Sequence, residues 1–244
     1  MVRLKLRTSA ALAAVFTGLV RQFNFDSYSK GQAVDIEKFI TEYLKYQIVY
    51  DNIAEEDAGK TAFLGDGKAS LCVWRDGKRV RVVPPADMIV VDRHFAQSTM
   101  TAPRRFKLAH EAGHIIMDML CGNAVVAAFN NEFNVERDYT LQELNGLFSL
   151  KETQATSMGV ALLMPKTLVT SMLQNLKGQK RIPTYGNNVL LDSDRKIICD
   201  MAEHFMVSYK SMFYRMRDLK LFEYRLIDEY IAMNLGGIGG GQPC

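Results

Sequence analysis

The feature that most constrains this 244-residue chain is the run His110-Glu111-Ala112-Gly113-His114. Residues four apart lie on the same face of an α-helix, so His110 and His114 can direct both imidazoles at one point. Two imidazoles placed in this way can hold one Zn²⁺. Glu111 projects toward the same side but is offset, which suits a general base better than a ligand. The spacing therefore predicts a metal site with hydrolytic chemistry on a helix.

The alternative is that these histidines are two surface residues of an ordinary helix. Their neighbours Phe106, Ala109, Ile115 and Ile116 argue for partial burial, where imidazoles without partners are costly. We therefore favour the metal site and expect Zn²⁺ as the cofactor. Mn²⁺ or Fe²⁺ would also suit a site of two histidines and a carboxylate, because geometry and availability decide between these metals.

A catalytic zinc needs a third protein ligand and an open fourth position. The only other histidines in the sequence are His94 and His204. The carboxylates that we consider for the third position are Asp118, Glu132, Glu136, Asp138, Glu143 and Glu152. Asp118 follows the second motif histidine by about 6 Å along the helix axis. It is therefore a poor third ligand, but its carboxylate could accept a hydrogen bond from one of the metal-binding side chains and so orient it.

Glu152 is the carboxylate best placed to be the third ligand. It opens a second predicted helix, in which Ala155, Thr156 and Gly159 share its face. The small residues Ala155 and Gly159 would let this helix approach the motif helix closely, where Gly113 is equally small. Without the motif, Glu152 would instead be explained as an acidic residue favoured by the helix dipole.

Composition and charge exclude several classes of protein. The net charge of +3 is too small to indicate a nucleic-acid partner. The four cysteines never occur at C-x-x-C spacing, which excludes a zinc ribbon, and scattered cysteines are typical of a reducing compartment. The apolar stretch 10–20 could resemble a secretory signal, but no small-x-small cleavage site follows it. We interpret it as an ordinary helix, too short to span a membrane, and expect a cytoplasmic protein.

The pattern along the chain predicts an α+β fold. We expect a helix over 35–46 capped by Asp35, strands at 47–50 and 88–91, and a hairpin whose turn is Asp76-Gly77. Helices follow over 103–120, 147–164, 165–176, 192–206 and 208–217. The sheet is thus small and mostly antiparallel. We also expect residues 88–92 to form a sheet edge to which a peptide could add by backbone hydrogen bonds.

Two segments resemble the ImmA/IrrE family of bacterial metallopeptidases. Arg105, Ala109 and the histidine motif fit its first pattern, R-x-x-x-A-H-E-x-G-H. Glu152, Ala155 and residues 162–165 (Leu-Leu-Met-Pro) fit its second, E-x-x-A-x-x-x-A-x-x-L-L-M-P. The chain departs from the family at 157–159, where Ser-Met-Gly replaces the usual Phe-Ala, and in the long segment between the motifs. The resemblance extends over about residues 30–220.

This resemblance implies a zincin-like fold, in which a small sheet packs on the motif helix and a helical C-terminal half follows. The implied domains are an N-terminal helix or extension (1–30), a metallopeptidase domain (31–225) and a C-terminal helix end with a flexible glycine-rich tail (226–244). It implies His110, His114 and Glu152 as metal ligands and Glu111 as the catalytic base. The implied substrate is a helix-turn-helix repressor whose cleavage relieves repression of a mobile element or of stress-response genes.

The C-terminal helical pair within 192–220 has helix-turn-helix spacing. Ser208 could cap the second helix, Met206 occupies the position of a turn glycine, and Arg215, Arg217 and Lys220 add positive charge. The alternative function is therefore a DNA- or protein-binding regulator that uses 199–220 beside a structural or sensing metal. Because no basic stripe is evident, we favour a scaffold and expect no direct nucleic-acid binding.

Two further residues are candidates for stabilising a developing oxyanion. Zinc peptidases commonly use a histidine or tyrosine donor for this purpose. His204 lies in a predicted helix, and Tyr185 lies in a predicted loop, 183–186, from which it could move toward a site. A third reading, a non-catalytic binding protein that retains the motif as a relic, is disfavoured because Glu111 is intact.

Overall fold

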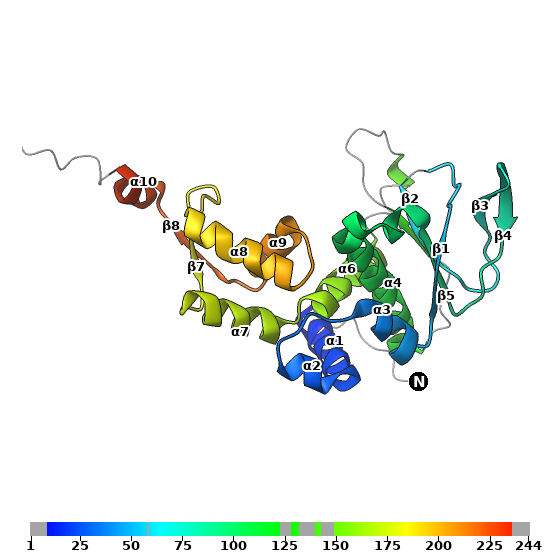
Figure 1. Ribbon diagram of the computed structural model, residues 1–244, viewed down its shortest axis with the longest axis horizontal. Coiled ribbons are helices and arrows are strands. Elements are labelled where there is room, and N and C mark those ends of the chain that lie inside the picture. Colours follow the sequence, from blue (N-terminus) through cyan, green and yellow to red (C-terminus); the bar gives the residue numbers. More distant parts are fainter. Residues whose placement is uncertain (1–8, 58, 123–127, 132–139, 143–148, 236–244) are drawn as a thin grey trace, which may run out of the picture. The chain divides into compact units, whose positions relative to one another are not determined.

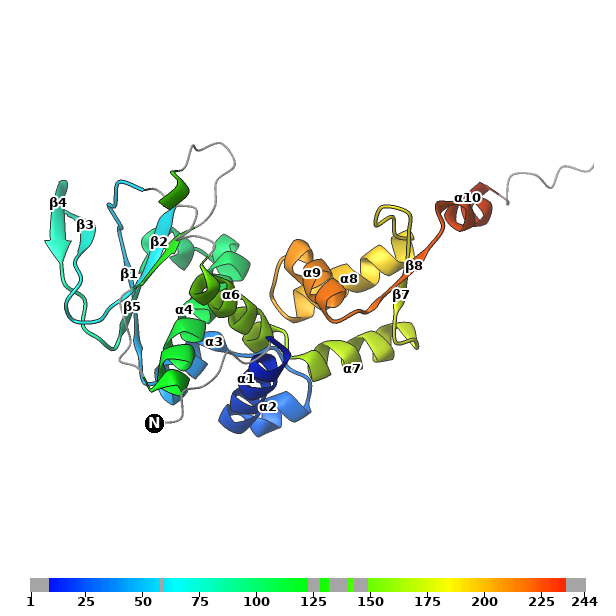
Figure 2. The ribbon, with the colours of Figure 1, turned by 180° about the vertical axis from the view of Figure 1, so that it is seen from behind.

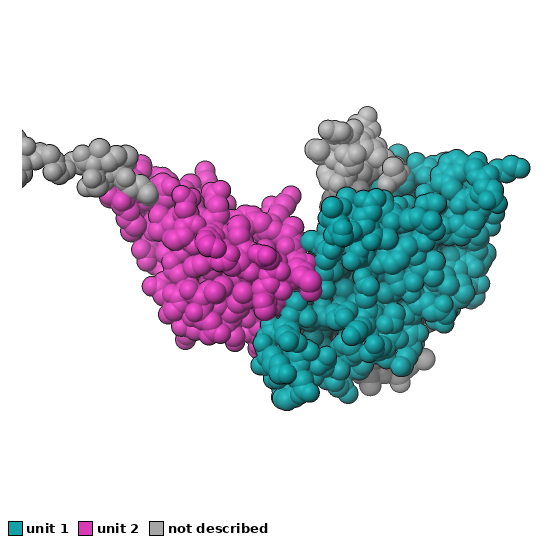
Figure 3. Space-filling view, in the orientation of Figure 1, with its two compact units in different colours: residues 1–165 teal, residues 166–244 magenta. Residues whose placement is uncertain are grey.

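The computed structural model describes residues 9–57, 59–122, 128–131, 140–142 and 149–235. The chain divides into two compact units, 1–165 and 166–244, which Figure 3 shows in different colours. The first unit is mixed α and β, as expected. Its described elements are α1 (Ser9–Phe23), α2 (Phe25–Ser29), α3 (Ile36–Lys38), η1 (Phe39–Tyr43), β1 (Gln47–Asp51), β2 (Lys60–Leu64), β3 (Leu71–Arg75), β4 (Lys78–Val82), β5 (Met88–Asp92), η2 (Arg93–Ala96), η3 (Ser98–Met100), α4 (Thr101–Cys121), β6 (Ala128–Asn131) and α6 (Leu150–Leu163).

The main sheet of the first unit has four described strands in the order β1-β5-β2-β6. β1 pairs with β5 in parallel, whereas β2 runs antiparallel to both β5 and β6. β3 and β4 form a separate antiparallel hairpin. Its turn residues Asp76 and Gly77 both have positive φ, 49° and 72°, as the predicted two-residue turn requires. The expectation of a small, mostly antiparallel sheet is confirmed.

The expectation that residues 88–92 form a sheet edge is wrong. These residues are β5, an inner strand paired on both sides by β1 and β2. The consecutive apolar residues Ile89, Val90 and Val91 are all buried. Such an unbroken run is typical of a strand covered on both faces, because an edge strand with one wet face alternates polar and apolar residues. Among the described strands, the edges are β1 and β6.

The helices of the first unit bring the chain's two predicted motifs together. α4 lies beside α6 in both views of Figures 1 and 2 and also contacts α3, β2 and β6. α1 packs on α6 and buries Phe16 and Val20, so the apolar stretch 10–20 is helical, as expected. Asp35 caps α3 by accepting a hydrogen bond from the backbone N–H of Lys38. No helix in the described ranges is long and apolar enough to cross a membrane.

The second unit is mainly helical. Its elements are α7 (Lys166–Lys177), β7 (Ile182–Tyr185), α8 (Asp192–His204), α9 (Tyr209–Asp218), β8 (Phe222–Arg225) and α10 (Ile227–Leu235). β7 and β8 pair in parallel. Met206, in the turn between α8 and α9, has φ of 51°, and the Ser208 hydroxyl accepts from the backbone N–H of Ser211. The turn and cap expected for the helical pair are therefore present. The expected tail, 236–244, lies outside the described residues.

Candidate metal centre

Helix α4 carries the histidine motif at the centre of the first unit. Pro103 lies in its first turn, where the missing N–H is not needed for an intrahelical bond. From Lys107 to Ile116 every residue is buried. The helix ends at Cys121 and is capped by Gly122, whose φ of 66° is the left-handed conformation typical of helix C-termini. The motif residues therefore all lie on the buried central stretch of α4.

Helix α6 approaches α4 at backbone contact distance. A Cβ built on Gly113 would lie 2.6 Å from the carbonyl oxygen of Ala155. A Cβ built on Gly159 would lie 2.9 Å from the carbonyl carbon of Ala109 and 3.0 Å from the backbone nitrogen of His110. Glycine at both positions therefore permits a packing that alanine would obstruct, and the close approach expected from the sequence is confirmed.

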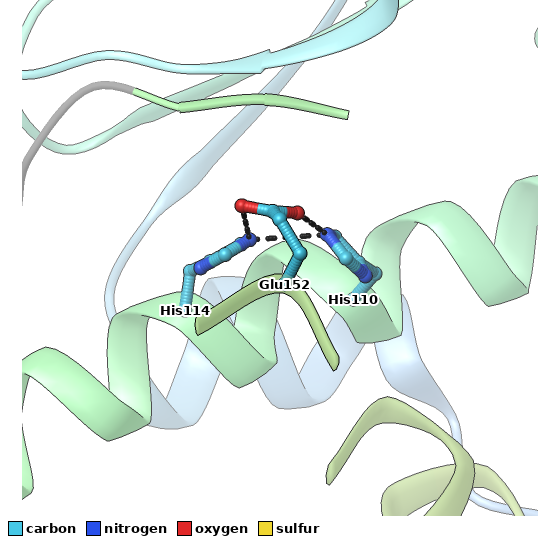
Figure 4. A group of neighbouring side chains, drawn as sticks. All are labelled: His110, His114 and Glu152. Atoms are coloured by element: carbon cyan, nitrogen blue, oxygen red, sulfur yellow. Dashed lines mark hydrogen bonds and ion pairs between the residues drawn. The ribbon is translucent and has the colours of Figure 1, made fainter. Parts of the chain in front are cut away.

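The close packing brings His110, His114 and Glu152 together, as Figure 4 shows. The Nε2 atoms of His110 and His114 are 3.0 Å apart. The two carboxylate oxygens of Glu152 lie 3.1 Å from Nε2 of His110 and 3.3 Å from Nε2 of His114. Ser149 caps α6, because its hydroxyl accepts a hydrogen bond from the backbone N–H of Glu152. Glu152 therefore lies in the first turn of the helix. Three donor atoms thus converge from two helices.

The spacing of these donors fits a tetrahedral metal. Zinc bonds of 2.0–2.1 Å to nitrogen or oxygen separate neighbouring ligand atoms by about 3.3 Å at the corners of a tetrahedron. The observed separations of 3.0–3.3 Å are close to this value. Two histidines and one carboxylate also leave a fourth position open, as a catalytic site requires. The three residues can therefore hold a divalent metal ion.

The carboxyl group of Glu152 is kept ionised by its neighbours. Burial alone would raise its pKa, but hydrogen bonds from His110 and His114, and their charge, lower the pKa to about 2. Its side chain is 25% exposed, whereas that of His114 is 1% exposed. The described part of the site is therefore most open on the side of Glu152, and this side chain presents an anionic oxygen throughout the neutral range.

Glu111, the expected base, is fully buried on α4 beside the first ligand candidate. Asp118 was expected to hold a metal-binding side chain in place without binding the metal itself. It is buried as well, and it accepts a 3.1 Å hydrogen bond from the ammonium of Lys151. Because Lys151 precedes Glu152, this ion pair ties the later turns of α4 to the first turn of α6. The role expected for Asp118 behind a ligand stays a prediction.

The other residues named from the sequence fall into three groups. Glu132, Glu136, Asp138 and Glu143 lie outside the described residues. His94 follows β5, where its Nδ1 is 2.6 Å from Asp92, and it does not belong to the metal cluster. His204 and Tyr185 belong to the second unit, His204 as the exposed last residue of α8.

Tyr185 is not in a loop, so this expectation is wrong. It ends strand β7, is 1% exposed, and its hydroxyl donates to the sulfur of Met233 at 3.6 Å. The prediction failed because Pro183 suggested a turn, although proline is tolerated on a two-stranded edge. The proposed roles of His204 and Tyr185 toward an oxyanion stay predictions.

The sequence analysis missed one polar contact of the cluster. The hydroxyl of Thr156 lies 3.1 Å from Nδ1 of His110. Its position on the same face of α6 as Glu152 was the only sequence signal, because a single threonine has no characteristic motif.

Three comparisons with known proteins bear on the family of this chain. A Mycobacterium tuberculosis transcriptional regulator of known structure is 13% identical, with a TM-score of 0.43, and the match covers 85% of this chain and 45% of that chain. This chain thus spans less than half the length of that protein. No curated protein sequence matches the chain. A family model, Peptidase_M78, described as the IrrE N-terminal-like domain, matches residues 73–217. This range covers more than half of the chain and contains α4 and α6 entirely, so the chain belongs to the M78 peptidase family.

Proposed function

We propose that this protein is a zinc-dependent endopeptidase that cleaves a helix-turn-helix transcriptional repressor. The observation that carries the proposal is the convergence of His110, His114 and Glu152 at the separations of a tetrahedral site. Membership of the M78 peptidase family supports a metallopeptidase-type function. The repressor substrate, the identity of the metal and the cytoplasmic location remain predictions from the sequence.

The proposal gives each residue of the centre a role. His110, His114 and Glu152 would hold the ion through Nε2, Nε2 and a carboxylate oxygen, and the ion would supply Lewis acidity toward a scissile carbonyl and a water molecule. Glu111 takes a proton from the attacking water molecule and passes it to the leaving amine. Its position next to His110 on α4 supports this role.

The edge strand β6 is the best place in the described sheet for a substrate peptide. It pairs only with β2 among the described strands and also contacts α4. An extended peptide can add to such an edge by backbone hydrogen bonds, with little demand on its sequence. This placement replaces the inner strand β5, which has no free edge for a peptide.

The helical pair α8–α9 supports the scaffold interpretation rather than a DNA reader. Arg215, one of the three basic residues noted in this pair, is buried, and burial lowers the pKa of its guanidinium. Arg217 is exposed but lies 4.6 Å over the ring of Tyr214. A duplex-binding helix needs exposed base-contacting side chains near its start, and the exposed residues there, Tyr209 and Lys210, bring a single positive charge. We therefore propose no nucleic-acid binding, and DNA binding that weakens steeply with salt would contradict this.

The decisive experiment is the substitution Glu111→Gln, which keeps the shape of the side chain but removes the base. Like the wild type, the variant should bind one equivalent of zinc, but it should cleave a co-expressed helix-turn-helix repressor at least 10²-fold more slowly. Glu42→Gln is the matched control, because Glu42 is exposed and lies outside the centre. Undiminished cleavage by Glu111→Gln would reject the proposal, and so would a wild type that binds no divalent metal.

A further inference from the structure

The two ring nitrogens of His110 have different surroundings. Nε2 faces the donor cluster, at 3.0 Å from Nε2 of His114 and 3.1 Å from Glu152. Nδ1 points away from the cluster and lies 3.1 Å from the hydroxyl oxygen of Thr156. The ring is therefore held at both ends, by the metal donors on one side and by a hydroxyl on the other.

A neutral imidazole carries only one N–H, so the proton's position decides whether it can bind a metal. Nε2 is a ligand only when the proton is on Nδ1. The Thr156 oxygen can accept a hydrogen bond from Nδ1–H, which stabilises that tautomer and leaves the lone pair of Nε2 directed at the cluster. A side chain without a hydroxyl at position 156 offers no such acceptor.

The geometry of α6 holds the Thr156 hydroxyl in this place. Thr156 follows Glu152 by four residues, so both side chains lie on the face turned toward α4. Gly159 lets the backbone of α6 come within reach of the backbone of His110 itself. One rigid helix thus supplies a carboxylate to the cluster and a hydroxyl to the opposite side of the first histidine.

The second histidine has no equivalent support among the described residues. Nδ1 of His114 is buried and has no hydrogen-bond partner in the described ranges. The Thr156 contact is therefore the single hydroxyl contact that the structure shows for a histidine of the cluster.

We propose that Thr156 is a positioning residue that fixes the tautomer and ring orientation of His110 for metal binding. The inference rests on the proposed metal site and adds a residue to it. Loss of a partner behind a metal ligand typically weakens metal binding by about 10–100-fold. The hydroxyl, rather than the packing of the side chain, must account for the effect.

The test measures zinc affinity of the full-length, metal-free chain by competition with a chelating dye. Thr156→Val keeps the size of the side chain but removes the hydroxyl, and we expect about 10–100-fold weaker zinc binding. Thr156→Ser restores the hydroxyl and should bind within about threefold of the wild type. Thr153→Val is the control, because Thr153 lies on the same helix, is exposed, and undergoes the same chemical change.

The outcomes separate this inference from the proposed function. Equal zinc affinity of Thr156→Val and the wild type overturns the inference, and so does an equal loss in Thr156→Val and Thr156→Ser. A wild type that binds no zinc overturns the proposed function itself. Wild-type zinc binding and cleavage with an unaffected Thr156→Val variant leaves the function intact and removes only the role of Thr156.

A second measurement needs no Thr156 variant to fold. Nitrogen-15 NMR of histidine rings distinguishes the two tautomers, and the chain has only four histidines. His94→Gln and His204→Gln assign the two resonances outside the cluster. We expect the His110 ring of the zinc-loaded wild type to carry its proton on Nδ1, hydrogen-bonded and slow to exchange. A rapidly exchanging Nδ1 proton in the zinc-loaded wild type overturns the inference.

Discussion

Gly113 of α4 lies against Ala155 of α6 so closely that a Cβ on the glycine would be 2.6 Å from the alanine's carbonyl oxygen. Real Cβ atoms do not approach a backbone oxygen so closely, and neither backbone can yield without moving its helix. Gly113 directly precedes His114, and Ala155 lies one helical turn after Glu152, so the contact adjoins two of the proposed ligands. The distance between these two proposed ligands therefore depends on the absence of one methyl group.

Gly113→Ala should separate the helices and weaken zinc binding by at least 10-fold. Alanine is the better helix former by about 1 kcal/mol, so any loss of stability must come from the clash. We expect a net destabilisation of about 1–3 kcal/mol, as for other overpacked cores. Urea unfolding of the metal-free chain and zinc titration measure the two effects separately.

Gly18→Ala is the control for that substitution. Gly18 is also helical, in α1, but a Cβ there would meet no atom of the described structure within 4 Å. We expect this variant to be more stable by roughly 0.5–1 kcal/mol, with unchanged zinc affinity. If both glycine variants behave alike, the helix contact does not determine the site.

Zinc affinity should not depend on pH through Glu152 in the mildly acid range. The pKa of Glu152 is lowered from the ordinary 4.5 to about 2, so this ligand stays ionised down to that pH. The ratio of the zinc affinities of the wild type and Glu152→Gln should therefore stay constant between pH 7 and pH 4.5. A ratio that shrinks toward pH 4.5 would show that the carboxyl group takes up a proton in this range.

The metal-free chain should show the effect of Glu152 on stability at acid pH. Because its folded pKa lies below the ordinary 4.5, the carboxylate stabilises the fold above about pH 4.5 and this contribution is lost as the pH falls toward 2. Between these values the wild type should lose more stability than Glu152→Gln. Equal losses in urea titrations at pH 4.5 and 2.5 would show that the carboxylate is not held as described.

The ion pair between Lys151 and Asp118 should contribute to both stability and metal binding. Lys151→Ala leaves a buried carboxylate without its ammonium partner, and we expect a loss of about 1 kcal/mol because the lysine is partly exposed. Zinc affinity should fall a few-fold, since the pair anchors the turn that carries Glu152. Lys196→Ala is the control: its i,i+4 pair with Asp200 is exposed and should contribute almost nothing. Equal effects would contradict the prediction.

The two oxyanion candidates can be separated by kinetics. Tyr185 is buried with its hydroxyl on Met233, so Tyr185→Phe should leave cleavage within about twofold. His204 is exposed on the second unit, and the kcat of His204→Asn at unchanged zinc affinity tests the role that the sequence predicts for it. A His204→Asn variant with the wild-type kcat would refute that role.

The sequence predicts the centre better than its surroundings. Helix periodicity is local, so the facing of His110 and His114 follows from their spacing alone. Gly113 and Gly159 also predict that two helices meet, because only small residues allow it. The order of strands depends on contacts between distant segments, so the inner position of β5 was not foreseen. The sequence also did not predict that Arg215 is buried, because arginine side chains are mostly exposed in folded proteins.

The two-helix origin of the donors has a consequence during synthesis. A nascent chain that stops before Leu150 contains both motif histidines but lacks α6, and with it the carboxylate and the hydroxyl. While it is attached to the ribosome, such a chain has the two histidines but neither Glu152 nor Thr156. Proteolytic competence would then arise only after α6 has emerged and docked, which protects neighbouring nascent polypeptides from an enzyme that is still being made.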